Sequence, residues 1–153
     1  MTDQVAALIA RSNRLGSDPK NTNYAGGNTS AKVMARDPLT GEQVEVLWVK
    51  GSGGDIGSMK MDGFSTLYMD RLQALKGKYR GVAHEDEMVG YLPHCTFALN
   101  PRAASIDTPL HAYLPFAHVD HVHPDAIIAL AAAVGATVEK GAPLLVLEAM
   151  KME

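Results

Sequence analysis

The segment TSAKVMARDPLTGEQVEVLWV, residues 29–49, contains two runs of β-forming residues separated by residues that favour turns. The runs extend from Thr29 to Ala35 and from Val44 to Val49, and their β-branched and aromatic side chains are typical of strands. Between them, RDPLTGE combines Pro, Asp and Gly, as short connections do. We therefore predict a β-hairpin at the centre of a sheet that other elements must cover.

Apolar residues at helical spacing predict those covering elements. Near the N-terminus, Val5 and Leu8 share a helical face behind a cap at Thr2 or Asp3, and Gly16 lies just past the predicted end. A second helix is predicted over residues 62–75, where Asp62 is the cap and Phe64, Leu67, Tyr68, Leu72 and Leu75 recur at helical spacing. Shorter helices are predicted over 85–92, near Thr108 and from Asp125, with a strand over the alternating residues before Pro124.

Length and charge limit the possible functions. The 153 residues suffice for one ordinary α/β domain. A net charge of −3 and an isoelectric point near 6.0 argue against nucleic acid or an acidic membrane surface as partner. Cys95 is the only cysteine, so an intrachain disulfide and a multi-cysteine zinc site are excluded. Residues 1–16 resemble neither a signal peptide nor a membrane span, and we expect a cytoplasmic protein.

Three histidines lie close together in AHVDHVHPDA, residues 117–126. On a strand, His121 and His123 would face the same way, and His118, at an odd offset, would face the opposite way. Two imidazoles on one face supply two of the three protein ligands that a catalytic zinc usually takes. The alternative, ordinary histidines at a strand end, stays open for so short a motif.

An acidic residue precedes this motif. Asp107, in SIDTPLHA, lies one helical turn before His111. A carboxylate beside a metal-polarised carbonyl can transfer a proton, although Asp is also a common helix cap.

Two glycine-containing loops could bind an anion. GGNTS, residues 26–30, and KGSGGD, residues 50–55, combine glycines with Asn28 and Ser52, so freed backbone N–H groups and side-chain donors could hold a phosphate. Tight turns are the alternative for either loop. A dinucleotide fingerprint is excluded because Ile56 stands where its last glycine should be. Lys50 fits a solvent-facing or phosphate-facing ammonium better than a Schiff-base lysine.

The sequence changes character at residue 134. VGATVEKGAPLLVLEAMKME, residues 134–153, resembles the first half of a biotinyl carrier domain, in which the lysine between two methionines is acylated by biotin. The resemblance implies that Lys151 is a biotin attachment site and that a biotin ligase is a partner. An ordinary lysine on a hairpin is the alternative, because MKM also occurs at residues 59–61.

In order along the chain, GGNTS, KGSGGD, ASIDTPLHA and HVDHVHPDA together resemble the class II, metal-dependent sugar-phosphate aldolases. Within this family they are most similar to the aldolase part of bifunctional rhamnulose-phosphate aldolase/alcohol dehydrogenases. The resemblance covers residues 1–133 and implies a three-layer α/β/α domain with a largely antiparallel sheet, a zinc site and a tetramer with sites at subunit interfaces. Residues 134–153 would then form a short β-rich biotinyl-like segment.

The resemblance also implies the roles of particular residues. His121 and His123 correspond to zinc ligands, and Asp107 corresponds to the catalytic acidic residue, which is usually Glu. The phosphate-binding positions correspond to Asn28, Ser52, Gly53 and Ser105. The implied reaction is reversible cleavage of a ketose 1-phosphate to dihydroxyacetone phosphate and an aldehyde, with zinc stabilising the enediolate.

The family takes its third histidine ligand from downstream of the H-x-H motif, and no histidine follows His123 here. We therefore expect a truncated aldolase domain joined to a truncated biotinyl segment, with impaired cleavage activity. Biotin carriage at Lys151, as in biotin-dependent carboxylases, is the alternative function.

Overall fold

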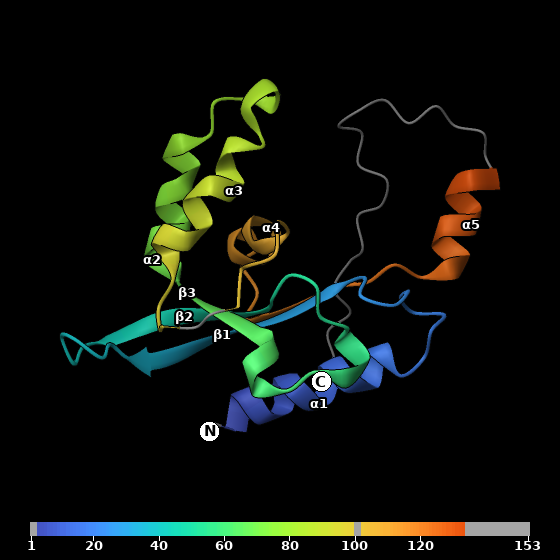
Figure 1. Cartoon of the computed structure of the whole chain (residues 1–153), viewed down its shortest axis with the longest axis horizontal. Coiled ribbons are helices and arrows are strands. Elements are labelled where there is room, and N and C mark those ends of the chain that lie inside the picture. The colour runs from blue at the N-terminus through green and yellow to red at the C-terminus, as the bar shows by residue number, and fades with distance from the viewer. Residues whose placement is uncertain (1–2, 100–101, 134–153) are drawn as a thin grey trace.

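A computed structural model describes residues 3–99 and 102–133. Its centre is a four-stranded sheet in the order β3-β2-β1-β4, in which every pair of neighbours is antiparallel (Figure 1). The predicted hairpin is confirmed, with Ser30 opposite Val49 and Arg36 opposite Gln43. The strands are β1 (Asn28–Arg36), β2 (Gln43–Lys50), β3 (Phe64–Tyr68) and β4 (His118–His121).

Helices lie on both faces of this sheet (Figure 1). One face is covered by α1, and α2, α3 and α4 lie on the other, which gives the predicted α/β/α arrangement. No helix in the described part of the chain is long and apolar enough to cross a membrane. The helices are α1 (Asp3–Gly16), α2 (Met69–Ala74), α3 (Glu87–Tyr91), α4 (Thr108–Tyr113) and α5 (Asp125–Ala133), and the 3-10 turns are η1 (Ile56–Ser58), η2 (Met61–Gly63), η3 (Leu75–Lys78), η4 (Val82–His84) and η5 (Leu92–Cys95).

Alternation along the strands divides the core into two clusters. Ala31 and Val33 of β1 face α1 and pack with Leu8. Leu47 and Val49 of β2 face the opposite helices. Since burial of one such aliphatic side chain contributes about 1.5–3 kcal/mol, both faces stabilise the sheet.

The helix predicted over 62–75 is wrong in its first half. Residues Phe64–Tyr68 form β3, which pairs with β2, and the helix that follows contains only Met69–Ala74. Phe64 and Leu67 are both fully buried, but they pack on opposite faces of the sheet. Their spacing of three therefore reflects strand alternation, and pairing with β2 overrides the apparent helical period.

The hairpin turn is organised by Asp37. Its Oδ1 accepts hydrogen bonds from the backbone N–H groups of Leu39 and Thr40, each at 2.8 Å, and its Oδ2 accepts one from the Tyr68 hydroxyl at 2.5 Å. The Tyr68 hydroxyl, followed by these backbone donors, lowers the pKa of Asp37 to about 2. The carboxylate thereby joins the turn to β3.

Replacement of Asp37 by Asn should lower the free energy of unfolding at neutral pH. Because the folded-state pKa lies below the ordinary value of about 3.9, the stabilisation is complete above pH 4 and is lost as the pH falls towards 2. Urea denaturation of D37N and wild type from pH 7 to pH 2 should therefore show a difference that shrinks on acidification. Exposed Asp62 supplies the control D62N, and a difference that persists unchanged at pH 2 would contradict the assignment.

Candidate active site

Pairing of β1 with β4 assembles the candidate site at one end of the sheet. The register places Asn28 opposite His121, although 93 positions separate them in the sequence. The backbones approach closely at Gly27, whose φ is +69° and where a Cβ atom would lie 2.7 Å from the His121 carbonyl oxygen. Glycine is therefore required there for both its conformation and its size.

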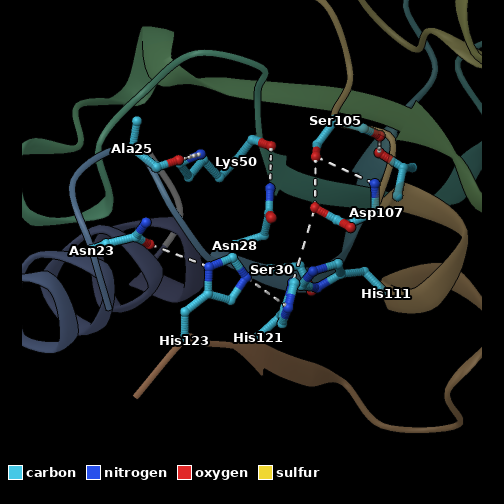
Figure 2. A network of polar contacts seen from close by, with 11 residues as sticks. Asn23, Ala25, Asn28, Ser30, Lys50, Ser105, Asp107, His111, His121 and His123 are labelled. Carbon is cyan, nitrogen blue, oxygen red and sulfur yellow. Dashed lines mark hydrogen bonds and ion pairs between the residues drawn. The ribbon is translucent and has the colours of Figure 1, made fainter. Parts of the chain in front are cut away.

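His121 and His123 point towards each other (Figure 2). The strand β4 ends at His121, so His123 lies just beyond it, yet their Nε2 atoms are only 3.1 Å apart. The remaining nitrogens face other acceptors: Nδ1 of His123 lies 3.2 Å from Asn23 Oδ1, and Nδ1 of His121 lies 3.9 Å from Asp107 Oδ2. Burial lowers the pKa of His121; the nearby Asp107 carboxylate opposes this effect, and His123 adds to it.

This pair fits two positions of a metal site. Two nitrogens bound to one tetrahedral zinc at 2.0–2.1 Å would be about 3.3 Å apart, close to the separation between the Nε2 atoms. Metal-binding histidines commonly direct their other nitrogen to a protein acceptor, as His123 does to Asn23; Nδ1 of His121 faces Asp107 at 3.9 Å, too far for a hydrogen bond. Within residues 3–99 and 102–133, no cluster of three His, Cys, Asp or Glu side chains could hold a metal.

Asp107 occupies the N-cap position of α4, but its side chain makes no capping hydrogen bond. Its Oδ2 accepts a hydrogen bond from Ser105 Oγ at 3.1 Å, and its backbone N–H donates to the same hydroxyl at 3.3 Å (Figure 2). The carboxylate is therefore directed towards His121 by Ser105. The sequence left two roles open for Asp107, proton transfer and helix capping. The side chain does not form the hydrogen bond that caps a helix.

His111 joins α4 to the sheet. The side chain is fully buried, and its Nδ1 lies 2.8 Å from Ser30 Oγ, whose hydroxyl proton is directed to the Val119 carbonyl. The Ser30 hydroxyl oxygen then accepts a hydrogen bond from the N–H at Nδ1 of His111. Burial, followed by the neighbouring His121, lowers the pKa of His111 to about 4. A neutral imidazole thus holds the helix that carries Asp107 against β1.

The predicted phosphate-binding residues lie on three adjacent segments. The side-chain amide of Asn28 donates to the Lys50 carbonyl at 3.3 Å, which joins the two glycine-containing loops. The backbone N–H of Ser52 donates a hydrogen bond to the Ala103 carbonyl at 2.9 Å, and this contact places the Ser52 loop beside the segment that carries Ser105. Gly53 has a φ of +74°, and apart from its chain neighbours no atom of the described residues lies within 4 Å of an ideal Cβ position there, so this side of the loop is open.

Lys50 is buried, which the sequence did not indicate. Only 3% of its surface is exposed, and its Nζ donates to the Ala25 carbonyl at 3.4 Å (Figure 2). Burial lowers its pKa, and Asp107 and Asp55 oppose this effect. Asn23 was also missed, because an Asn in a polar loop carries no sequence signal of its contact with His123.

Two predictions fall outside the described residues. The biotin attachment site at Lys151 and the boundary between residues 133 and 134 both depend on residues 134–153, which the structure does not describe.

Comparison with known proteins identifies the family. Residues 7–152 match the model of the class II aldolase and adducin N-terminal domain, and the chain therefore belongs to this family. The match supports the predicted aldolase-like fold with its antiparallel sheet and helices.

Two relatives extend this result. The N-terminal class II aldolase domain of a conserved protein from Thermoplasma acidophilum superimposes with a TM-score of 0.75 at 34% identity, over 84% of this chain and 58% of that one. The uncharacterized oxidoreductase YuxG of Bacillus subtilis (strain 168) is 46% identical over 129 residues, which are 84% of this chain and 18% of YuxG. The chain thus spans less than a fifth of that relative.

Zinc titration tests the histidine pair. We expect weak binding that chelators reverse, because the described residues supply only two ligands. H121A and H123A should each lower the affinity by more than about tenfold, since loss of a ligand exceeds the effect of losing one of its outer partners. Isothermal titration calorimetry measures both.

His118 supplies the matched control because it is an exposed histidine on the same strand. H118A should bind zinc as the wild type does. Equal losses in H118A and H121A would show that zinc binds elsewhere on the surface.

Proposed function

We propose that the domain catalyses metal-dependent aldol cleavage of a ketose 1-phosphate. The observation that carries this proposal is the convergence of the two Nε2 atoms, the Asp107 carboxylate and the two glycine-containing loops at one end of the sheet in a class II aldolase-family domain. His121 and His123 would hold the metal, and the remaining ligands would come from outside the described residues. When bound, a divalent metal polarises the substrate carbonyl.

The reaction requires one bond cleavage and two proton transfers. The C4 hydroxyl gives its proton to solvent and C4 becomes the aldehyde carbon as the bond between C3 and C4 of the ketose breaks. The electron pair of that bond moves to the C2 carbonyl to give the enediolate of dihydroxyacetone phosphate. A proton is then added at C3. In this proposal Asp107 carries that proton, and in the reverse direction it removes the proton from C3. Ser105 orients the carboxylate through its hydroxyl.

The substrate proposed is of the rhamnulose 1-phosphate type, and the metal proposed is zinc. Support comes from the sequence resemblance to bifunctional rhamnulose-phosphate aldolase/alcohol dehydrogenases and from YuxG, a much longer relative that is named an oxidoreductase. We also propose that the protein is a cytoplasmic tetramer whose active sites lie at subunit interfaces. A partner subunit at the site would be one source of further metal ligands.

Proton exchange into dihydroxyacetone phosphate tests the assignment of Asp107 without requiring full cleavage. In D₂O with zinc, the domain should exchange a C3 proton, which one-dimensional NMR detects. D107N should slow this exchange about 10²–10⁴-fold, the usual contribution of a positioned general base. D86N, at an exposed aspartate before α3, is the control.

Exchange at the wild-type rate in D107N would remove Asp107 from the mechanism. Absence of exchange in the wild type, with zinc shown to be bound at His121, would refute the proposed function.

Biotin carriage is the second candidate, and the run VGATVEKGAPLLVLEAMKME favours it. Incubation with a biotin ligase, biotin and ATP, followed by mass spectrometry, distinguishes the two. Under the aldolase proposal we expect little or no labelling, because Lys151 is then an ordinary lysine. Near-complete labelling that disappears in K151R, and persists in the control K60R, would establish the carrier function.

A further inference from the structure

The sheet does not fix the direction of the His123 side chain. The strand β4 ends at His121, and its register with β1 stops at the pair of Asn28 and His121. Beyond a strand end, an imidazole can rotate between staggered rotamers about its bonds to the main chain. The separation of 3.1 Å between Nε2 of His123 and Nε2 of His121 therefore requires a restraint from another segment.

The loop before β1 supplies this restraint. The backbone N–H of Gly26 donates to the Asn23 carbonyl at 3.0 Å and closes a tight turn. Earlier in the same loop, the Lys20 carbonyl accepts a hydrogen bond from the backbone N–H of Asp125 at 3.0 Å. The loop thus holds the segment after β4 twice, through the main chain of Asp125 and through the side-chain contact of Asn23 with His123 (Figure 2).

Gly26 allows the contact between Asn23 and His123. A Cβ atom at position 26 would overlap the Asn23 side-chain oxygen and would lie 3.0 Å from Nδ1 of His123. The amide and the imidazole therefore occupy the space that a side chain at position 26 would fill, and there Oδ1 and Nδ1 lie 3.2 Å apart. Any larger residue at this position must displace the amide or the ring.

The chemistry of this contact fixes the tautomer of the His123 ring. An amide oxygen can only accept a hydrogen bond, so Nδ1 of His123 carries the N–H that points to Asn23. The neutral ring then has its lone pair on Nε2, the nitrogen that faces His121. A histidine binds a metal through such a lone pair. Without an acceptor at Nδ1, the neutral ring can carry its proton on either nitrogen.

We propose that Asn23 and Gly26 position His123 as a metal ligand, with the proton held on Nδ1 and the Nε2 lone pair directed towards the metal. Asn23 is a positioning residue in this assignment, because it acts through His123. The inference rests on the proposed function, which includes a metal held by His121 and His123. Loss of such a partner of a ligand histidine typically lowers metal affinity about 10–100-fold.

The first measurement observes the ring directly and needs no metal. Two-dimensional ¹H–¹⁵N NMR of the histidine rings in the full chain, at about pH 8, distinguishes the protonated nitrogen from the one with the lone pair. His123 should carry its proton on Nδ1 in wild type and in N23D, which retains an acceptor. N23L and G26A should shift the proton towards Nε2. N21L is the matched control, because the Asn21 amide lies in the same loop and donates to the Leu15 carbonyl.

The second measurement is zinc titration by calorimetry. N23L and G26A should each bind zinc about tenfold or more weakly than wild type. N23D should bind at least as tightly as wild type, because carboxylates are common partners of ligand histidines. N21L should match wild type in both its His123 tautomer and its zinc affinity.

Several results would overturn the inference. They are a wild-type His123 ring protonated on Nε2, zinc affinity unchanged in both N23L and G26A, and equal losses of affinity in N21L and N23L, which would show that Asn23 supports only the loop. Absence of zinc binding by wild type would overturn the inference together with the metal site. Zinc affinity that depends on Asn23, combined with no Asp107-dependent proton exchange, would leave this inference standing and refute the aldolase function.

Discussion

The antiparallel pairing of β1 with β4 is the constraint on which the site depends. It brings Asn28 opposite His121 and so joins an early glycine-containing loop to a late histidine motif. The ion pair between Arg11 and Asp120, with 3.0 Å between Arg11 Nε and Asp120 Oδ1, links α1 to the same strand. His111 and Ser30 fix the helix on the other face. Any shift of this register by one residue would turn the histidines to the opposite face.

The candidate site contains buried polar side chains that make the fold less stable than apolar side chains would. Asn28, Ser30, Lys50 and His111 are all nearly or fully buried, and one imidazole nitrogen in each of His111 and His121 has no hydrogen-bond partner among the described residues. Buried polar atoms without partners are rare and destabilising. Their concentration at one end of the sheet supports an arrangement that is completed by bound groups. The apolar clusters elsewhere supply the stability that offsets them.

The sequence predicted most of the sheet because its signals are local. The composition of residues 29–49 predicts the hairpin, and alternation predicts the strand that ends at His121. The spacing of Phe64 and Leu67 misled the helix prediction. Residues at positions i and i+3 share one face of a helix, but on a strand they lie on opposite faces, and both faces of this sheet are covered. The common direction of His121 and His123 was expected, although His123 lies outside the strand.

Other features of the site could not be predicted because they depend on contacts between distant segments. The burial of Lys50 follows from the approach of the loop containing Ala25, and the release of the Asp107 side chain from capping follows from Ser105. Neither contact leaves a periodic pattern in the chain. Family resemblance locates such residues, whereas their protonation and exposure emerge only from the packing.

The neutral state of His111 sets an acid limit on the assembled site. With its pKa lowered to about 4 from an ordinary value near 6.5, the unfolded chain binds a proton on this residue more readily than the folded chain between these pH values. Acidification therefore weakens the contact between α4 and β1 before it affects Asp37 in the hairpin turn. The two ends of one sheet thus have different acid tolerance, and the end that carries the candidate site is the more sensitive.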